Sequence, residues 1–469
     1  MRRRTLLALF LTATSISLTA QVTYKSTIYD EGGRNVVSAD FNRDGLPDLA
    51  FPSDDGIGVV LNTGNGNFGD PITTPTADNS EYAFLLALDV NGDQWPDLLR
   101  LNETADIFIN NHDGTFTQGK SLDCPDYAYA AQAGDLNGDG KVDIVMFNKT
   151  RLQVFLGDGA GGFTPGQVLT FAQTPNYGYN VPFALADVNG DGKLDLVLEE
   201  PSKVVIWPGT GKGTFGTPTF ITNPTGDSTN HALVQVLVSD FNNDGYPDIA
   251  LAAANFVSCN DGHDCGMGDI FIYRNDGQGN FTLINSFQAG PDGALLTAGD
   301  LNGDGNIDLL LSEQNPDEPQ NYYVLGKGNG TFGSQVRADS ATQVVERDLN
   351  LDGRNDLVLS SSWGDNMVVE IANNGDVNCP PPGSASLSAK ICMPSSSSGS
   401  SPLLVRASGN SPLGVKRIEI WIDGKKAAQK LDSQIGKRFT LSPGTHRIAV
   451  VAVDQYLGTA TTAKNVTIE

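Results

Sequence analysis

A nine-residue motif rich in aspartate occurs seven times, and this repetition constrains the fold more than any other feature of the sequence. The motif reads Asp-x-Asn-x-Asp-x-x-x-Asp, and successive copies begin 46 to 60 residues apart. The copies start at Asp40, Asp89, Asp135, Asp187, Asp240, Asp300 and Asp348. Repeats of about 50 residues with glycine-rich turns are typical of propeller blades built from four antiparallel strands. The repeat predicts an all-β fold with a seven-bladed β-propeller of four-stranded blades.

Short apolar runs around each motif supply the expected strands, because they are too short and too rich in β-branched residues for helices. After the third run, a glycine-rich turn ends in phenylalanine in six units, and we expect the fourth strand to start there. These phenylalanines are Phe68, Phe116, Phe163, Phe215, Phe281 and Phe332. The seventh unit lacks one. We therefore expect the N-terminal segment Val22–Ile28 to complete the seventh blade, which would leave no open sheet edge.

Each motif carries side-chain oxygens at positions 1, 3, 5 and 9, and position 7 can offer its backbone carbonyl. Hard oxygen ligands at this spacing suit Ca²⁺, and three carboxylates crowded into one turn would repel one another without a cation. Asp, Asn and Gly also simply make good turns, which is the alternative interpretation. We expect up to seven Ca²⁺ ions, one per blade. The expected ligands are Asp40, Asn42, Asp44, Leu46, Asp48; Asp89, Asn91, Asp93, Trp95, Asp97; Asp135, Asn137, Asp139, Lys141, Asp143; Asp187, Asn189, Asp191, Lys193, Asp195; Asp240, Asn242, Asp244, Tyr246, Asp248; Asp300, Asn302, Asp304, Asn306, Asp308; Asp348, Asn350, Asp352, Arg354 and Asp356.

The second motif departs from the pattern, because Gln94 replaces the glycine that the other six motifs have at position 6. Whether this loop holds calcium is left open by the sequence. None of the seven loops is an EF-hand, since that motif requires a glutamate at position 12 and no copy has one there.

Several other functions are disfavoured. A formal net charge of −25 offers no basic surface to neutralise the phosphates of a nucleic acid. The G-x-G-x-x-G sequences at Gly64, Gly211 and Gly328 precede strand-like or proline-containing sequence, whereas a dinucleotide site requires a helix there. The four histidines are scattered and no G-x-S-x-G motif occurs, so we expect no catalytic residues and no enzyme activity.

Residues 1–20 are typical of a signal peptide. Three arginines, Arg2 to Arg4, precede the apolar stretch Leu6–Leu18, and Ala20 offers a small residue for cleavage. We expect the mature chain to be secreted or displayed at the cell surface (periplasmic or extracellular), without a transmembrane segment. The sequence does not decide between Sec and twin-arginine export, or between a free and a surface-attached protein.

The five cysteines fit an exported chain. Cys259 with Cys265, and Cys379 with Cys392, are close pairs and therefore disulfide candidates, while Cys124 is left over. The alternative is that Cys259, Cys265 and His263 between them bind a metal ion, although a fourth ligand is missing.

The seven motifs resemble the FG-GAP/VCBS repeat family, whose β-propeller is that of the integrin α N-terminal domain. The resemblance covers about Val22–Val377. It implies that each motif binds Ca²⁺ between the first two strands of a blade. It also implies a role in adhesion, recognition or architecture more often than in catalysis. Some family members are lectins, and some are appended to enzymes.

Composition changes after the repeats, and we expect a propeller over 21–378, a linker over 379–384 and a second domain over 385–469. Alternating runs such as Arg417–Asp423 and Arg447–Asp454 favour a small β-sandwich in this last segment. It resembles bacterial immunoglobulin-like modules, which usually act as spacers or docking units.

A ligand site is expected on the propeller face opposite the calcium loops, because aromatic residues on variable loops over a rigid scaffold suit recognition. The aromatic and histidine candidates are Tyr82, Tyr127, Tyr129, Tyr177, Tyr179, His231, Tyr322 and Trp363, and packing on neighbouring blades is the alternative for each. We expect a monomeric, non-catalytic binding or adhesion protein whose partner is a protein or a glycan. The alternative is a carbohydrate-active propeller, foremost a lectin and otherwise a polysaccharide lyase or hydrolase.

Overall fold

The protein, described from a computed structural model, consists of strands and turns, and its described residues contain no helix. The structure describes residues 23–29, 35–64, 66–77, 83–123, 128–148, 151–170, 183–200, 202–226, 231–255, 267–291, 294–301, 305–313, 321–338, 343–350, 356–360, 367–373, 386–393, 398–399, 403–411, 415–430, 434–454 and 458–468. The predicted signal peptide, the predicted linker 379–384 and Cys124, Cys259, Cys265 and Cys379 lie outside these ranges.

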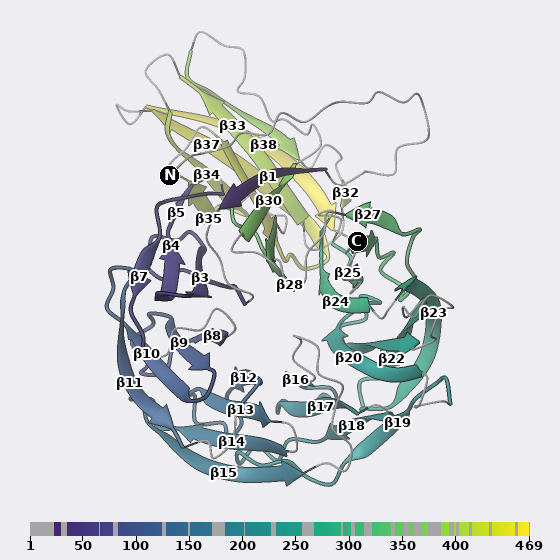
Figure 1. Ribbon diagram of the computed structural model, residues 1–469. Helices are drawn as coiled ribbons and strands as arrows, with labels where there is room; N and C mark the ends of the chain where they lie inside the picture. The colour runs from purple at the N-terminus through teal and green to yellow at the C-terminus, as the bar shows by residue number, and fades with distance from the viewer. Residues whose placement is uncertain are drawn as a thin grey trace.

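Four-stranded antiparallel sheets follow one another around a ring, with the first strand of each sheet on the inside (Figure 1). The sheets are, from first to last strand: β2(Val37–Ala39), β3(Asp48–Ser53), β4(Gly56–Val60), β7(Ile72–Thr74); β8(Phe84–Leu88), β9(Asp97–Leu101), β10(Ala105–Asn110), β11(Phe116–Leu122); β12(Ala130–Gly134), β13(Asp143–Asn148), β14(Arg151–Gly157), β15(Phe163–Thr170); β16(Phe183–Ala186), β17(Asp195–Glu200), β18(Lys203–Trp207), β19(Thr219–Thr222); β20(His231–Ser239), β21(Asp248–Asn255), β22(Met267–Asn275), β23(Phe281–Pro291); β24(Ala294–Gly299), β25(Asp308–Glu313), β26(Asn321–Val324), β27(Val336–Ala338); and β28(Gln343–Arg347), β29(Asp356–Ser360), β30(Met367–Asn373), β1(Thr23–Tyr29). A separate hairpin joins β5(Asn62–Gly64) to β6(Asn67–Phe68). The predicted all-β propeller fold is therefore confirmed.

The last of these sheets joins the two ends of the repeat region. Strand β1 pairs antiparallel with β30 over its whole length, from Thr23 opposite Asn373 to Tyr29 opposite Met367. The predicted completion of this sheet by the N-terminal strand is confirmed, with the strand one residue further along than expected.

The middle strands of the sheets are buried on both faces, because each sheet packs against the sheets before and after it. All five residues of β9 and all six of β13 are buried. This double burial explains why the sequence reads as continuous apolar runs after each motif rather than as alternating strands.

The phenylalanine of each glycine-rich turn packs against position 2 of the motif in the preceding sheet. Phe116, for example, lies edge-on to Phe41 with ring centroids 5.7 Å apart. The other pairs share apolar clusters: Val90 with Phe163, Leu136 with Phe215, Val188 with Phe281, Phe241 with Phe332, and Leu349 with Phe68. The motif loops are thus anchored at the seams between sheets.

The prediction that each fourth strand starts at the turn phenylalanine is only partly right. It holds for β11, β15 and β23. In contrast, Phe68 lies in the hairpin strand β6, and the fourth strand β7 begins at Ile72. Phe215 and Phe332 form isolated bridges with Gly209 and Gly326, and β19 and β27 begin a few residues later. In the fourth sheet the intervening Pro218 cannot donate a ladder hydrogen bond, which explains the break there.

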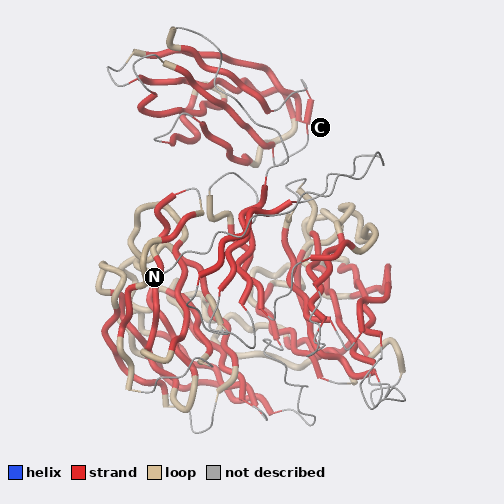
Figure 2. The backbone as a smooth tube through the Cα atoms, turned by 45° about the horizontal axis from the view of Figure 1, so that its top comes forward, coloured by secondary structure: helices blue, strands red, loops and turns tan. Residues whose placement is uncertain are grey.

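The C-terminal segment forms a second body of two sheets, which Figure 2 shows apart from the ring. One sheet contains β31(Ser388–Met393), β33(Leu403–Asn410) and β36(Gln434–Phe439). The other contains β32(Ser398–Gly399), β38(Thr459–Ile468), β37(Gly444–Asp454), β34(Val415–Ile422) and β35(Lys425–Lys430). Val405, Ile420 and Val450 from the two sheets share one core, so this segment is a β-sandwich. Its immunoglobulin-like classification and the domain boundaries stay predictions.

Candidate functional site

The motif loops connect the first and second strands of the propeller sheets, and their side chains fold back onto the loop backbone. In the first loop, Asp40 accepts hydrogen bonds from the N–H of Asp44 at 3.1 Å and of Gly45 at 2.9 Å. Asn42 accepts from the N–H of Asp44 at 2.9 Å, and Asp44 accepts from that of Leu46 at 2.8 Å. The side chains at positions 1, 3 and 5 therefore all turn toward the same short stretch of backbone.

The same pattern recurs in the second to fifth loops, and one of its hydrogen bonds is also described in the sixth. The bond from position 5 N–H to the position 3 side chain measures 2.8–2.9 Å in each of the first five loops. The bond from position 6 N–H to the position 1 carboxylate measures 2.8–2.9 Å in the first six. Position 5 is exposed in the first five loops. Asn302, Asp304, Asp352 and Arg354, from the sixth and seventh loops, lie outside the described residues.

The aspartate at position 9 has a different environment, because it opens the second strand and is completely buried in all seven sheets. One carboxylate oxygen accepts the N–H of position 2, at 2.8–3.2 Å in all seven. The other accepts an N–H from the last residue of the third strand or from the second residue after it, at 2.7–2.8 Å in six sheets. Each position 9 carboxylate thus clamps its motif loop to its own sheet.

Burial raises the pKa of the position 9 carboxyl groups in the first five loops, Asp48, Asp97, Asp143, Asp195 and Asp248. For Asp48, Asp97 and Asp248 it raises the pKa to about 6, although the two backbone hydrogen bonds act in the opposite direction. The charged carboxylates at positions 5 and 1 raise it further. Each loop therefore concentrates negative charge next to a buried acid.

This donor set fits a hard cation by its chemistry. Two carboxylates and one amide oxygen turn toward a common backbone stretch, and an oxygen that accepts one N–H keeps a further lone pair for a metal ion. No group of three His, Cys, Asp or Glu side chains among the described residues lies close enough together to form a ready metal cluster.

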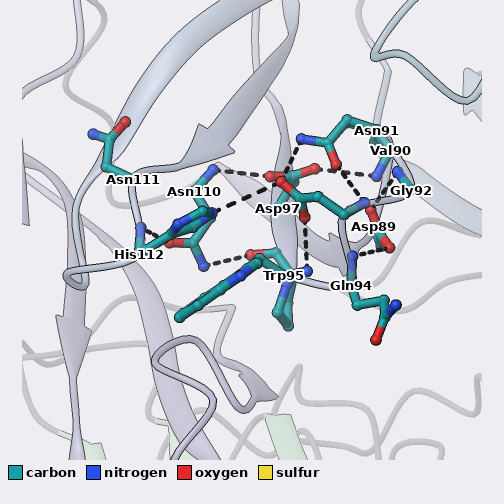
Figure 3. Close-up of polar contacts among 12 residues, drawn as sticks. Asp89, Val90, Asn91, Gly92, Gln94, Trp95, Asp97, Asn110, Asn111 and His112 are labelled. Carbon is teal, nitrogen blue, oxygen red and sulfur yellow. Dashed lines mark hydrogen bonds and ion pairs between the residues drawn. The ribbon is translucent and has the colours of Figure 1, made fainter.

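The second loop keeps this arrangement although it lacks the glycine. Gln94 adopts a positive φ of 68°, and its N–H still donates to Asp89 (Figure 3). Beside it, the Trp95 ring stacks on His112 with centroids 4.0 Å apart, and the Arg43 guanidinium lies 5.5 Å from the centroid of the Trp95 ring. This aromatic contact was not predicted from the sequence. Its signal was the histidine at a turn position where the five other Gly–Phe turns have glycine.

The residues predicted for the opposite face are only partly described. Tyr82, Tyr127, Tyr177, Tyr179 and Trp363 lie outside the described residues, and only the backbone of His231 is described. Tyr129 and Tyr322 are partly buried and pack against apolar clusters between sheets. These two tyrosines therefore follow the packing alternative.

Comparison with solved structures identifies propeller-like relatives at low identity. One is an Agrocybe aegerita lectin that recognises non-reducing terminal N-acetylglucosamine, at 18% identity and a TM-score of 0.49, covering 76% of this chain and 87% of the lectin. Another is the extracellular domain of a hybrid two-component system from B. thetaiotaomicron, at 12% identity and a TM-score of 0.40, covering 94% of this chain and 55% of that one. A third is a fungal alcohol oxidase, at 9% identity and a TM-score of 0.49, covering 95% and 99%. Because identity and structural similarity are this low, no activity is inferred from them.

No curated protein matches the chain in a sequence comparison. Within the part of the chain that the structure describes, no helix has the length and apolarity needed to cross a membrane. The FG-GAP-like repeat model, in contrast, matches residues 40–100, 89–146, 135–198, 187–251 and 240–311, which together cover more than half of the chain. These matches contain the first six motif loops and the buried strands that follow them, and the chain belongs to the FG-GAP-like repeat family.

Proposed function

We propose that the chain is an exported, calcium-binding β-propeller that acts as a non-catalytic binding or adhesion protein outside the cytoplasm. The observation that carries the calcium assignment is the repeated loop geometry. In each of the first five loops, the same three side chains turn toward one backbone stretch, and the position 5 carboxylate is exposed to solvent.

In this proposal, the side chains at positions 1, 3 and 5 hold the ion. Bound Ca²⁺ would supply positive charge in a loop that carries three aspartates, and would offset the repulsion between their charges. The position 9 aspartate would act mainly by fixing the loop, since both of its oxygens already accept backbone N–H groups. The carbohydrate-active alternative stays a prediction.

Metal analysis tests the calcium proposal directly. After dialysis against Ca²⁺, we expect at least five ions per chain, and a chelator should lower the melting temperature because the metal binds the folded state preferentially. The double variant Asp240→Ala, Asp244→Ala should lose one equivalent of Ca²⁺, since it removes both carboxylates at positions 1 and 5 of one loop. Fewer than about three ions in the wild-type protein would contradict the proposal.

The binding role is tested separately, with a glycan array and a reducing-end assay on polysaccharides. Glycan binding without turnover supports a lectin-type role. Turnover would contradict the non-catalytic assignment.

A further inference from the structure

An asparagine at the end of the third strand joins two neighbouring motif loops. Asn275, which is 1% exposed, donates from Nδ2 to the carbonyl of Val188 at 2.7 Å and to that of Pro247 at 2.9 Å. Val188 is position 2 of the fourth motif, whereas Pro247 is position 8 of the fifth. One side-chain amide therefore holds the start of one loop and the end of the next.

Two more asparagines occupy the same place. Asn110 donates to Phe41, position 2 of the first motif, and to Pro96, position 8 of the second, both at 2.9 Å. Asn62 donates to Leu349, position 2 of the seventh motif, at 2.7 Å and to Pro47, position 8 of the first, at 2.9 Å. We call an asparagine that makes these two hydrogen bonds an asparagine latch. One latch lies between the seventh and first sheets, one between the first and second, and one between the fourth and fifth.

The third, fourth and sixth sheets have glycine instead, at Gly157, Gly209 and Gly326. A Cβ atom there would lie 2.0–2.2 Å from the position 8 carbonyl oxygen, so no asparagine fits. In these sheets the preceding position 2 carbonyl accepts a backbone N–H instead. The donors are Gly161 to Val90, Gly213 to Leu136 and Gly330 to Phe241, at 2.9–3.0 Å.

The sheets with asparagine and the sheets with glycine also differ at position 8 of the motif. This residue is proline in the three sheets with asparagine (Pro47, Pro96 and Pro247), and Val142, Leu194 or Ile307 in the three with glycine. In the sheets with asparagine, one side chain contacts position 8 of its own motif and position 2 of the preceding motif, and so connects two loops. In the sheets with glycine, a backbone N–H contacts only position 2 of the preceding motif.

We propose that Asn275 is a positioning residue for the cation sites of the fourth and fifth loops, and that it couples the two sites. The inference rests on the proposed calcium function. Position 2 of the fourth loop directly follows its first ligand, and position 8 of the fifth loop directly precedes the position 9 aspartate that fixes that loop. The amide therefore holds the start of one ligand loop and the end of the other. A loop that is already ordered loses less conformational freedom when the ion binds. An ion in one loop, by ordering the shared latch, then favours binding in the other.

Terbium luminescence sensitised by Tyr246, at position 7 of the fifth loop, tests the positioning role. The Tb³⁺ luminescence that is lost in the Tyr246→Phe variant is the part that reports on the fifth loop. Asn275→Ala should weaken Tb³⁺ binding at the fifth loop about three- to tenfold, as expected for the loss of about one hydrogen bond's net contribution. The control Asn280→Ala changes an exposed asparagine that bonds only within its own turn, to Asp276, and should leave the affinity unchanged. An affinity within twofold of wild type in Asn275→Ala would overturn the proposal, even if the protein were less stable.

A second experiment leaves the latch intact and uses loop positions that are not buried, so it does not depend on the folding of Asn275→Ala. Asp187→Ala removes the position 1 carboxylate of the fourth loop, and should weaken Tb³⁺ binding at the fifth loop about threefold or more through the latch. Asp135→Ala makes the same change in the third loop, whose boundary with the fourth sheet has glycine in place of the asparagine latch, and it should have no effect at the fifth loop. Equal effects of the two variants, or none, would overturn the coupling. Absence of Tb³⁺ and Ca²⁺ binding to the wild-type protein would instead contradict the proposed function itself.

Discussion

Replacing Asp248 with alanine should lower the free energy of unfolding by about 2–6 kcal/mol, measured by urea denaturation with chelator present. The carboxylate is fully buried and accepts the N–H of Phe241 at 3.2 Å and that of Asn275 at 2.8 Å. Alanine leaves both amides without this acceptor, and each buried unsatisfied donor costs about 1–3 kcal/mol. Because a chelator is present, a bound cation does not contribute, and the loss of stability reports the two backbone hydrogen bonds alone.

The matched control is Asp244→Ala in the same loop. Asp244 is exposed, and its carboxylate accepts only the N–H of Tyr246 at 3.0 Å from the backbone. With chelator present, this variant should change stability by less than about 1 kcal/mol, because water replaces the lost acceptor. If the two variants were equally stable, position 9 would have no structural role beyond that of an ordinary loop aspartate.

Much of the propeller could be predicted from the repeat. A motif every 46 to 60 residues leaves room for four short strands, and the missing turn phenylalanine of the seventh unit indicated that another segment had to complete that sheet. The pairing of β1 with β30 confirms this. The start of the fourth strand was harder to predict, because proline near the turn and the seam with the preceding sheet decide where ladder pairing resumes.

The roles of residues within each motif could not be predicted from the pattern. The spacing marks positions 1, 3, 5 and 9 as oxygen donors, but it does not say that Asp248 and its equivalents point into the sheet while Asp244 and its equivalents point to solvent. That difference arises because position 9 begins a strand buried on both faces. The asparagine latch also joins residues far apart in the chain, such as Asn275 and Val188, and becomes visible only when the sheets are placed side by side.

Part of the negative charge of this acidic chain lies inside the fold. Each of the seven motifs contains three aspartates, and the seven at position 9 are fully buried. Their charge lies inside the fold and is compensated by backbone N–H groups. The formal net charge of −25 therefore overstates the negative charge that the surface presents to a partner.

Replacing Glu199 with methionine should stabilise the protein, and the gain should increase with pH. Glu199, near the end of β17, is fully buried, and neither of its carboxylate oxygens has a hydrogen-bond partner among the described residues. Burial raises the pKa of this carboxyl group well above its ordinary value of 4.5, and the charge of Glu200 raises it further. Methionine has a similar length, is apolar and removes the buried polar group.

The sign of the pH dependence follows from this raised pKa. Because the folded protein holds the proton more tightly than the unfolded chain, Glu199 costs least below about pH 4.5, and the cost grows as the pH rises toward the folded-state pKa. At pH 5 we expect Glu199→Met to gain about 1–3 kcal/mol, the cost of burying a polar group without a hydrogen bond. At pH 8 the gain should be larger, by about 1.4 kcal/mol for each unit by which burial raises the pKa within this range.

Urea denaturation of wild type and variant at both pH values measures this difference in the free energy of unfolding. The contribution of the motif loops to the pH dependence is the same in both proteins and cancels in the difference. The control is Glu200→Met, because Glu200 is 3% exposed and its carboxylate lies 3.4 Å from Nζ of Lys203. Removing it leaves Lys203 without this ion pair, so no gain in stability is expected.

A stability difference for Glu199→Met that stayed constant or shrank between pH 5 and pH 8 would mean that the carboxylate is ionised and compensated in the folded protein. The interior between the fourth and fifth sheets would then be polar, which its apolar neighbours Val197, Val204 and Leu233 argue against.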